Sequence, residues 1–151
     1  MTEMTLAAAR AKHAELGAII AALMARPTTT VAVAATDIQL HDGEHYAGAV
    51  LNDDGTVKHH LVLMADRPDG NVDWHNAKKW AASIGGELPD RQEAALIYAN
   101  CKPHVDGAWH WTSEQHTNES YAWICGFYDG IQTGDRKDDY HAARAVRRVT
   151  P

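Results

Sequence analysis

Two helix beginnings in the middle of the chain restrict most strongly what it can fold into. The first is at Asp73, whose short acceptor side chain suits an N-cap. The apolar residues after it share one helical face until the glycines at 85–86, and they are Trp74, Ala77, Trp80, Ala81 and Ile84. The second is at Asp90, where Glu93 completes a capping-box pattern, and we expect that helix to continue to Cys101, just before a proline.

Short strand patterns flank these helices on both sides. Before them, runs at 46–51 and 59–64 are separated by the turn sequence at 52–55, which predicts a β-hairpin. After them, short runs are separated by polar or glycine turns, at 109–111, 121–128, 130–139 and 142–149, and the first two of these runs bear aromatic residues. This order predicts an α+β fold in which two helices pack on small antiparallel sheets.

A further helix is predicted at residues 5–25, and Pro27 ends it. Its apolar seam has the alternating spacing of three and four that is typical of a short coiled coil, at Leu6, Ala9, His13, Leu16, Ile20 and Leu23. Either this helix packs on its own domain, or it joins copies of the chain into a homo-oligomer. We divide the chain into the helix at 1–27, a linker or strand at 28–37, and one domain at 38–151.

The charge balance argues against nucleic acid as a partner. Of 151 residues, 14 are Lys or Arg and 20 are Asp or Glu, so the formal charge is -6. No apolar run approaches the roughly 20 residues that cross a bilayer, and the first residues lack the order of a secretory signal. We therefore expect no membrane insertion. Cys101 and Cys125 lack CxxC spacing and are expected to be reduced and buried.

The ten histidines raise the question of a metal site or a catalytic centre. His59 and His60 are strand neighbours that point to opposite faces, so they cannot share one ion without a bulge. Glu114 and His116 are the nearest acid and base on one strand face, but no nucleophile motif or glycine-rich phosphate loop accompanies them. We predict no enzyme activity, no metal and no cofactor.

Three arginines near the end of the chain form another cluster. Strand alternation separates Arg144 and Arg148 from Arg147, so the three cannot act together as a phosphate grip. We expect them to pair with the surplus acids instead, with Arg147 partly buried.

The segment from 121 to 140 is the strongest candidate for function. If Trp123, Cys125 and Phe127 face the core, the intervening residues point outward, and polar turn residues follow them. Rigid aromatic side chains among adaptable polar ones are typical of recognition surfaces. The predicted ligand-binding residues are His110, Glu114, Tyr121, Ile124, Tyr128, Asp129, Gln132, Asp135 and Arg136.

Four segments together resemble a phage and prophage family of domains of unknown function, itself similar to the C-terminal domain of collagen-like bacterial adhesins. The segments are Gly86-Glu87-Leu88-Pro89-Asp90-Arg91-Gln92-Glu93, Trp109-His110-Trp111-Thr112-Ser113-Glu114, Tyr121-Ala122-Trp123 with Phe127, and Arg144-Ala145-Val146-Arg147-Arg148. The resemblance covers roughly residues 46–149. It implies a C-type-lectin-like fold, which formylglycine-generating enzymes and the targets of diversity-generating retroelements also have.

The chain departs from two better-known groups with this fold. It has neither the EPN or QPD loop nor the WND triplet with which lectins bind calcium. Its cysteines lie at a predicted helix end and in a predicted strand, which does not match the active-site cysteine pair of the formylglycine-generating enzymes. A shared fold does not carry function with it.

What the resemblance implies is a recognition protein of a phage or prophage. Such a protein is receptor-binding, tail-associated or a variable ligand-display protein, with a protein or carbohydrate receptor on a bacterial surface as its partner. It is made in the host cytoplasm and carried in the virion tail. The alternative is a small intracellular phage protein that binds and inhibits a host defence protein, its acidic surface meeting a basic site.

Overall fold

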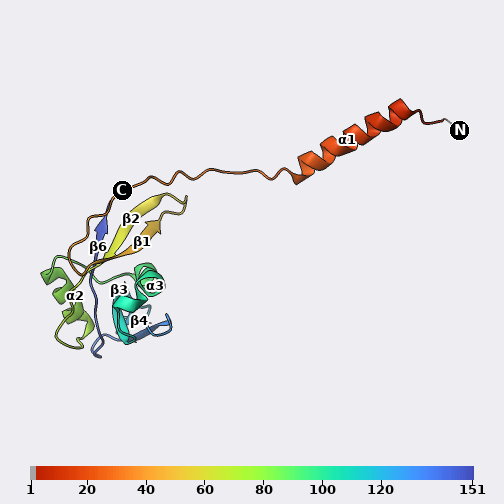
Figure 1. Ribbon diagram of the computed structural model, residues 1–151. Coiled ribbons are helices and arrows are strands. Elements are labelled where there is room, and N and C mark those ends of the chain that lie inside the picture. The colour runs from red at the N-terminus through yellow and green to blue at the C-terminus, as the bar shows by residue number, and fades with distance from the viewer. Residues whose placement is uncertain (1–2) are drawn as a thin grey trace. The chain divides into compact units, whose positions relative to one another are not determined.

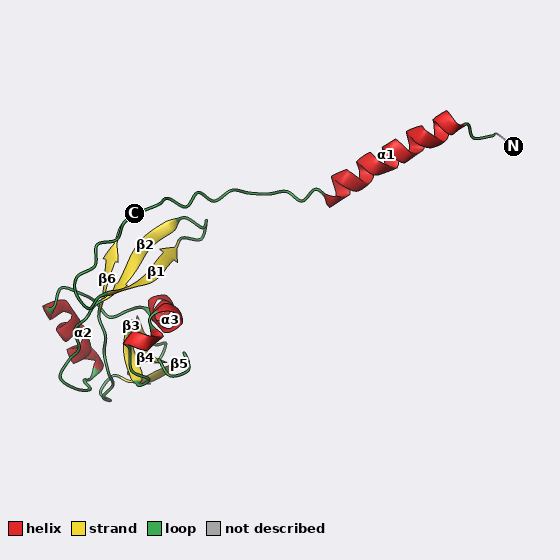
Figure 2. Ribbon diagram, in the orientation of Figure 1, coloured by secondary structure: helices red, strands yellow, loops and turns green. Residues whose placement is uncertain are grey.

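The computed structural model describes residues 3–151 of the chain, which divides into two units, 1–32 and 33–151. The larger unit is mixed α and β, with two short helices and two three-stranded antiparallel sheets, as the sequence predicts (Figures 1 and 2). Across residues 3–151, no helix has both the length and the apolarity needed to span a membrane.

The smaller unit contains α1 (Leu6–Met24), which confirms the predicted N-terminal helix. The hydroxyl of Thr5 caps it by accepting a hydrogen bond from the Ala8 amide at 3.1 Å. No residue of α1 is buried, and its large apolar side chains are exposed. Residues 25–43 then contain neither helix nor strand, so the run at 28–35 is not a strand.

The first sheet joins the predicted hairpin to the end of the chain. It consists of β1 (His45–Leu51), β2 (Val57–Leu63) and β6 (Val146–Val149), in the order β1-β2-β6 (Figure 1). Gly48 has a φ of 124° at a shift in the β1–β2 register, a conformation that favours glycine. It lies against Asn100, whose side chain donates to the Ala47 carbonyl at 2.6 Å.

The second sheet consists of β3 (Trp109–Gln115), β4 (Tyr121–Gly126) and β5 (Gln132–Arg136), in that order. The predicted strand pattern at the end of the chain is therefore correct, although the strands belong to two sheets. The run at 142–149 is shorter as a strand than predicted, because β6 begins only at Val146.

Both central helices form as their caps predict. α2 (Trp74–Ser83) begins where the Asp73 side chain accepts the Asn76 amide, and Gly85 follows its end with a φ of 80°. α3 (Arg91–Asn100) has the full capping box between Asp90 and Glu93. A single 3-10 turn, η1 (Lys102–His104), follows it.

The core has two parts, and β4 contributes to both. Ala122 and Ile124 pack in a cluster with Trp74 of α2, whereas Cys125 and Phe127 pack in a cluster with apolar residues of α3 and the first sheet. Because side chains alternate along a strand, α2 and α3 cover opposite faces of β4. Neither face of this strand is fully exposed along its centre.

Candidate functional site

An open depression of about 640 Å³, which we call the groove, lies on the surface of the larger unit. Five parts of the chain contribute to it: the start of α2, the β3–β4 turn, the start of β4, the end of β5 and the segment after β5. Its lining residues are Asp73, His75, Ser120, Tyr121, Arg136, Lys137, Asp138 and Tyr140.

Backbone hydrogen bonds fix the walls of the groove relative to one another. The Trp74 amide donates to the Lys137 carbonyl at 3.1 Å, and the Lys137 amide donates to the Ser120 carbonyl at 2.9 Å. The side chain of Asp73 accepts from the Asn76 amide at 3.0 Å, and this hydrogen bond lowers the pKa of Asp73. The groove is therefore formed in advance and needs no folding of loops around a ligand.

The surface of the groove mixes aromatic rings with charges of both signs. Tyr140 is 66% exposed, and Tyr121 is partly buried. Arg136 donates two hydrogen bonds to Asp138, at 3.0 and 2.8 Å, and these raise the pKa of Arg136. The Lys137 ammonium lies 4.8 Å from the centre of the Trp74 ring. Aromatic faces beside donors and acceptors suit a polar, uncharged ligand better than an ion of one sign.

Two of the predicted ligand-binding residues, Tyr121 and Arg136, lie in the groove. Asp135 lies beside them in β5 but is engaged elsewhere, because its carboxylate is 2.7 Å from Nε2 of His141. Burial opposes ionisation of Asp135, yet hydrogen bonds from the Arg136 amide and from His141 lower its pKa overall.

Glu114 and Gln132, which were also predicted, connect α3 to the second sheet. The Arg91 amide donates to Glu114 at 3.0 Å, and Gln132 exchanges two hydrogen bonds with Arg91, at 2.9 and 2.7 Å. The Arg91 guanidinium lies 3.6 Å from the centre of the Trp123 ring. These side chains stabilise the sheet that carries one wall of the groove.

Tyr128 and Asp129 lie on the turn between β4 and β5, outside the groove. Tyr128 is 78% exposed, while Asp129 accepts from the Ile131 amide at 3.1 Å within the turn. Trp109 and Ile131 are also exposed here. We call these exposed side chains, Trp109, Tyr128 and Ile131, the second aromatic surface.

His110 and Ile124 are corrections to the predicted site, because they are only 2% and 3% exposed. The prediction assumed that one face of β4 meets solvent. Instead α2 covers the face that contains Ile124, and His110 packs against Phe127 with a ring separation of 4.5 Å. Trp123 alternates to the same face as the buried Cys125, as predicted, but it is only partly buried and lies beneath Arg91.

Six groove residues are not among the predicted ligand-binding residues, although the last three lie in the segment 121–140: Asp73, His75, Ser120, Lys137, Asp138 and Tyr140. Asp73 was recognised only as a helix cap. Nothing local relates the start of α2 to the segment after β5, which lies more than 60 residues further along the chain. The contact between them forms only when both segments meet the second sheet.

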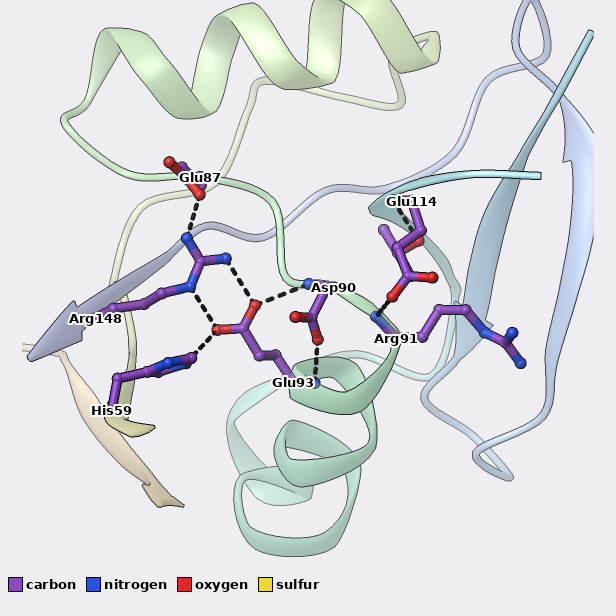
Figure 3. Close-up of polar contacts among 8 residues, drawn as sticks. His59, Glu87, Asp90, Arg91, Glu93, Glu114 and Arg148 are labelled. Carbon is purple, nitrogen blue, oxygen red and sulfur yellow. Dashed lines mark hydrogen bonds and ion pairs between the residues drawn. The ribbon is translucent and has the colours of Figure 1, made fainter. Parts of the chain in front are cut away.

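A cluster of charged side chains surrounds Glu93 (Figure 3), and it shares no residue with the lining of the groove. Glu93 is fully buried, and its carboxylate accepts from Arg148 at 2.8 and 2.7 Å, from His59 at 2.9 Å and from the Asp90 amide at 3.0 Å. Glu87 also contacts Arg148. The cluster connects β2, β6 and α3.

The cluster is structural, because both carboxylate oxygens of Glu93 already accept hydrogen bonds from the protein. Burial alone would raise the pKa of Glu93, but the hydrogen bonds from Arg148 and the Asp90 amide lower it overall. Burial raises the pKa of Asp90. His60, next to His59, instead meets the Tyr46 hydroxyl at 2.8 Å, so the two histidines take separate partners.

The arginine prediction is confirmed for two of the three residues. Arg147 donates to Glu44 at 2.9 and 2.6 Å, and Arg148 pairs with Glu93 and Glu87. Arg144 differs, since it is buried and its partners among residues 3–151 are backbone carbonyls.

The cysteines and histidines are the side chains that could carry thiol chemistry or hold a metal ion. Cys101 and Cys125 are free and buried, as predicted, and burial raises the pKa of both thiols. Within residues 3–151, no group of three or more His, Cys, Asp or Glu side chains is arranged to hold a metal ion.

No protein-family model matches the chain, and no curated protein matches it in sequence.

Proposed function

We propose that this chain is a non-enzymatic recognition protein of phage or prophage origin that binds its ligand in the groove. The observation that carries the proposal is that backbone hydrogen bonds join the walls of the groove, with Tyr121 and Tyr140 at its surface. A rigid site of this kind avoids the entropic cost of ordering loops on binding.

The domain at 38–151 is proposed to have a C-type-lectin-like fold. Two observations support this. The domain is α+β with two small antiparallel sheets, and its last strand returns to the first hairpin. The four segments on which the resemblance rests lie in α3 and its approach, β3, β4 and β6. The proposed ligand is a protein or carbohydrate receptor on a bacterial surface, and the proposed location is the phage tail.

α1 is proposed to join copies of the chain. Its exposed seam contains Leu16, Ile20 and Leu23, and from Leu16 to Ala25 the chain has no polar side chain. An apolar helix in water gains stability by association. Several copies would raise the apparent affinity of a weak groove by avidity.

The test uses fluorescently labelled full-length chain and a panel of whole bacterial cells. Tyr140→Ala in the groove is compared with Tyr128→Ala on the second aromatic surface. We expect Tyr140→Ala to abolish saturable cell binding while the melting temperature changes little, because this side chain is mostly exposed. Loss confined to Tyr128→Ala would move the site to the β4–β5 turn, and no binding to any host strain would contradict the proposal.

The formal charge of -6 favours a second candidate, an intracellular inhibitor of a host defence protein with a basic site. The two candidates differ in where the protein is found. A tail component remains with purified virions, whereas an inhibitor is absent from them and co-purifies with a host protein.

A further inference from the structure

A second, smaller pocket of about 130 Å³ lies away from the groove and shares no lining residue with it. Three parts of the chain form it: the loop after β2, the start of β3 with the segment before it, and the segment before β6. Its lining residues are Arg67, Pro68, Gly70, Asn71, Asp106, His110, Ala142, Ala143 and Arg144.

Arg144 gives this pocket its unusual character. The residue is only 4% exposed, and its two terminal nitrogens donate to the carbonyls of His104 and Met64, each at 2.8 Å. Its Nε has no hydrogen-bond partner in residues 3–151. Backbone carbonyls orient a guanidinium without neutralising its charge, so a buried positive charge remains uncompensated.

The other charged residues of the pocket do not remove this excess. Arg67 is a second guanidinium, and Asp106 is the single carboxylate. Asp106 lies 4.0 Å from Arg67 in a loose, half-exposed contact, and its Oδ1 accepts from the Ala108 amide at 3.0 Å. Two guanidinium groups and one carboxylate leave one positive charge, within a protein that is acidic as a whole.

His110 closes the inner side of the pocket. Its Nδ1 lies 2.8 Å from the Ala108 carbonyl, which can only accept, so Nδ1 carries the hydrogen. Its Nε2 lies 3.7 Å from Asp106, beyond a hydrogen bond. Burial lowers the pKa of His110, so the ring is neutral near pH 7 and adds no charge.

We propose that this pocket binds a small carboxylate, which enters beside Arg67 and compensates the buried charge of Arg144. The small volume excludes a large ligand, and the single excess positive charge matches a monoanion better than a dianionic phosphate. The carboxylate competes with Asp106 for Arg67. This site is independent of the groove and of the function proposed for it.

The test is a titration of the full-length protein with sodium acetate, followed by ¹H–¹⁵N NMR against sodium chloride at equal ionic strength. We expect saturable shifts of the Gly70, Asn71 and Ala143 amides, with a dissociation constant in the millimolar range. Arg67→Gln should weaken acetate binding about tenfold, because a charge-assisted hydrogen bond is lost. Arg67 is more than half exposed, so this variant keeps the fold.

Two further variants make the test specific. Asp106→Asn retains the acceptor for the Ala108 amide but removes the competing charge, so it should tighten binding several-fold. Arg26→Gln removes the same charge as Arg67→Gln from an exposed position outside both pockets and should leave acetate binding unchanged. Shifts that match those in chloride, or equal affinity in Arg67→Gln, would mean an adventitious ion only. Tighter binding of inorganic phosphate than of acetate would overturn the assignment to a carboxylate.

Discussion

Arg148 of β6 and Glu93 of α3 face each other across two hydrogen bonds, at 2.8 and 2.7 Å, although 55 residues separate them in the chain. The Arg148 side chain is partly exposed, whereas Glu93 is completely buried. The last strand is thus connected to the capping box of α3. Closure of the first sheet and correct placement of α3 depend on the same carboxylate.

Glu93→Gln is expected to destabilise the protein by about 3 kcal/mol, because it leaves the Arg148 charge without its buried partner. Urea denaturation measures the change. Glu87→Gln is the matched control, since Glu87 contacts the same arginine but is 67% exposed, and its loss should cost less than about 1 kcal/mol. Equal effects of the two variants would contradict a structural role for the buried pair.

The pH dependence of stability should reveal the same carboxylate. The folded-state pKa of Glu93 lies below its ordinary value of about 4.3, so its contribution is fully present above that pH. The contribution is then lost as the pH falls through the folded-state pKa. Urea midpoints of the protein and of Glu93→Gln should converge on acidification from about pH 6 to about pH 3, across the range in which carboxyl groups titrate. A constant difference would contradict the pKa direction.

Arg91→Ala is expected to cost roughly 1–2 kcal/mol, because the stacking on Trp123 and the hydrogen bonds with Gln132 are lost together. Tryptophan fluorescence should also shift to longer wavelength as Trp123 meets water. Arg91→Lys retains the charge but not the planar stack, so its stability should lie between those of the unmodified protein and Arg91→Ala. An unchanged emission spectrum in Arg91→Ala would contradict the contact.

Cys101 and Cys125 should react slowly with a thiol reagent in the native protein, because both are buried and burial raises their pKa. Denaturant should release two reactive thiols per chain, as expected for free cysteines. Fast reaction of either thiol in the native protein would show that the core around that cysteine opens readily.

The association proposed for α1 predicts a mass in solution that is a multiple of 16.6 kDa. Leu16→Asp introduces a charge into the apolar seam and should return the protein to a monomer. The melting temperature of the domain at 38–151 should not change. A monomeric unmodified chain in sedimentation equilibrium would contradict the proposal.

The sequence alone determined the elements whose signals are local. The Asp73 cap and the Asp90–Glu93 capping box each operate within three residues, and the turn ending at Gly55 depends on a short run. Local hydrogen bonds and backbone preferences need no tertiary contact to be recognised, which is why both helices and the hairpin were predicted at nearly the right positions.

Only the tertiary structure decided which faces are open and which distant groups meet. Ile124 and His110 were placed outside because alternation distinguishes two faces but does not say whether both are covered. His59 reaches Glu93 across 34 residues, and Asp73 comes to line the groove with Tyr140, through packing of helices and loops on the sheets. Such contacts follow from strand order and burial, which arise from the whole chain at once and leave no local pattern.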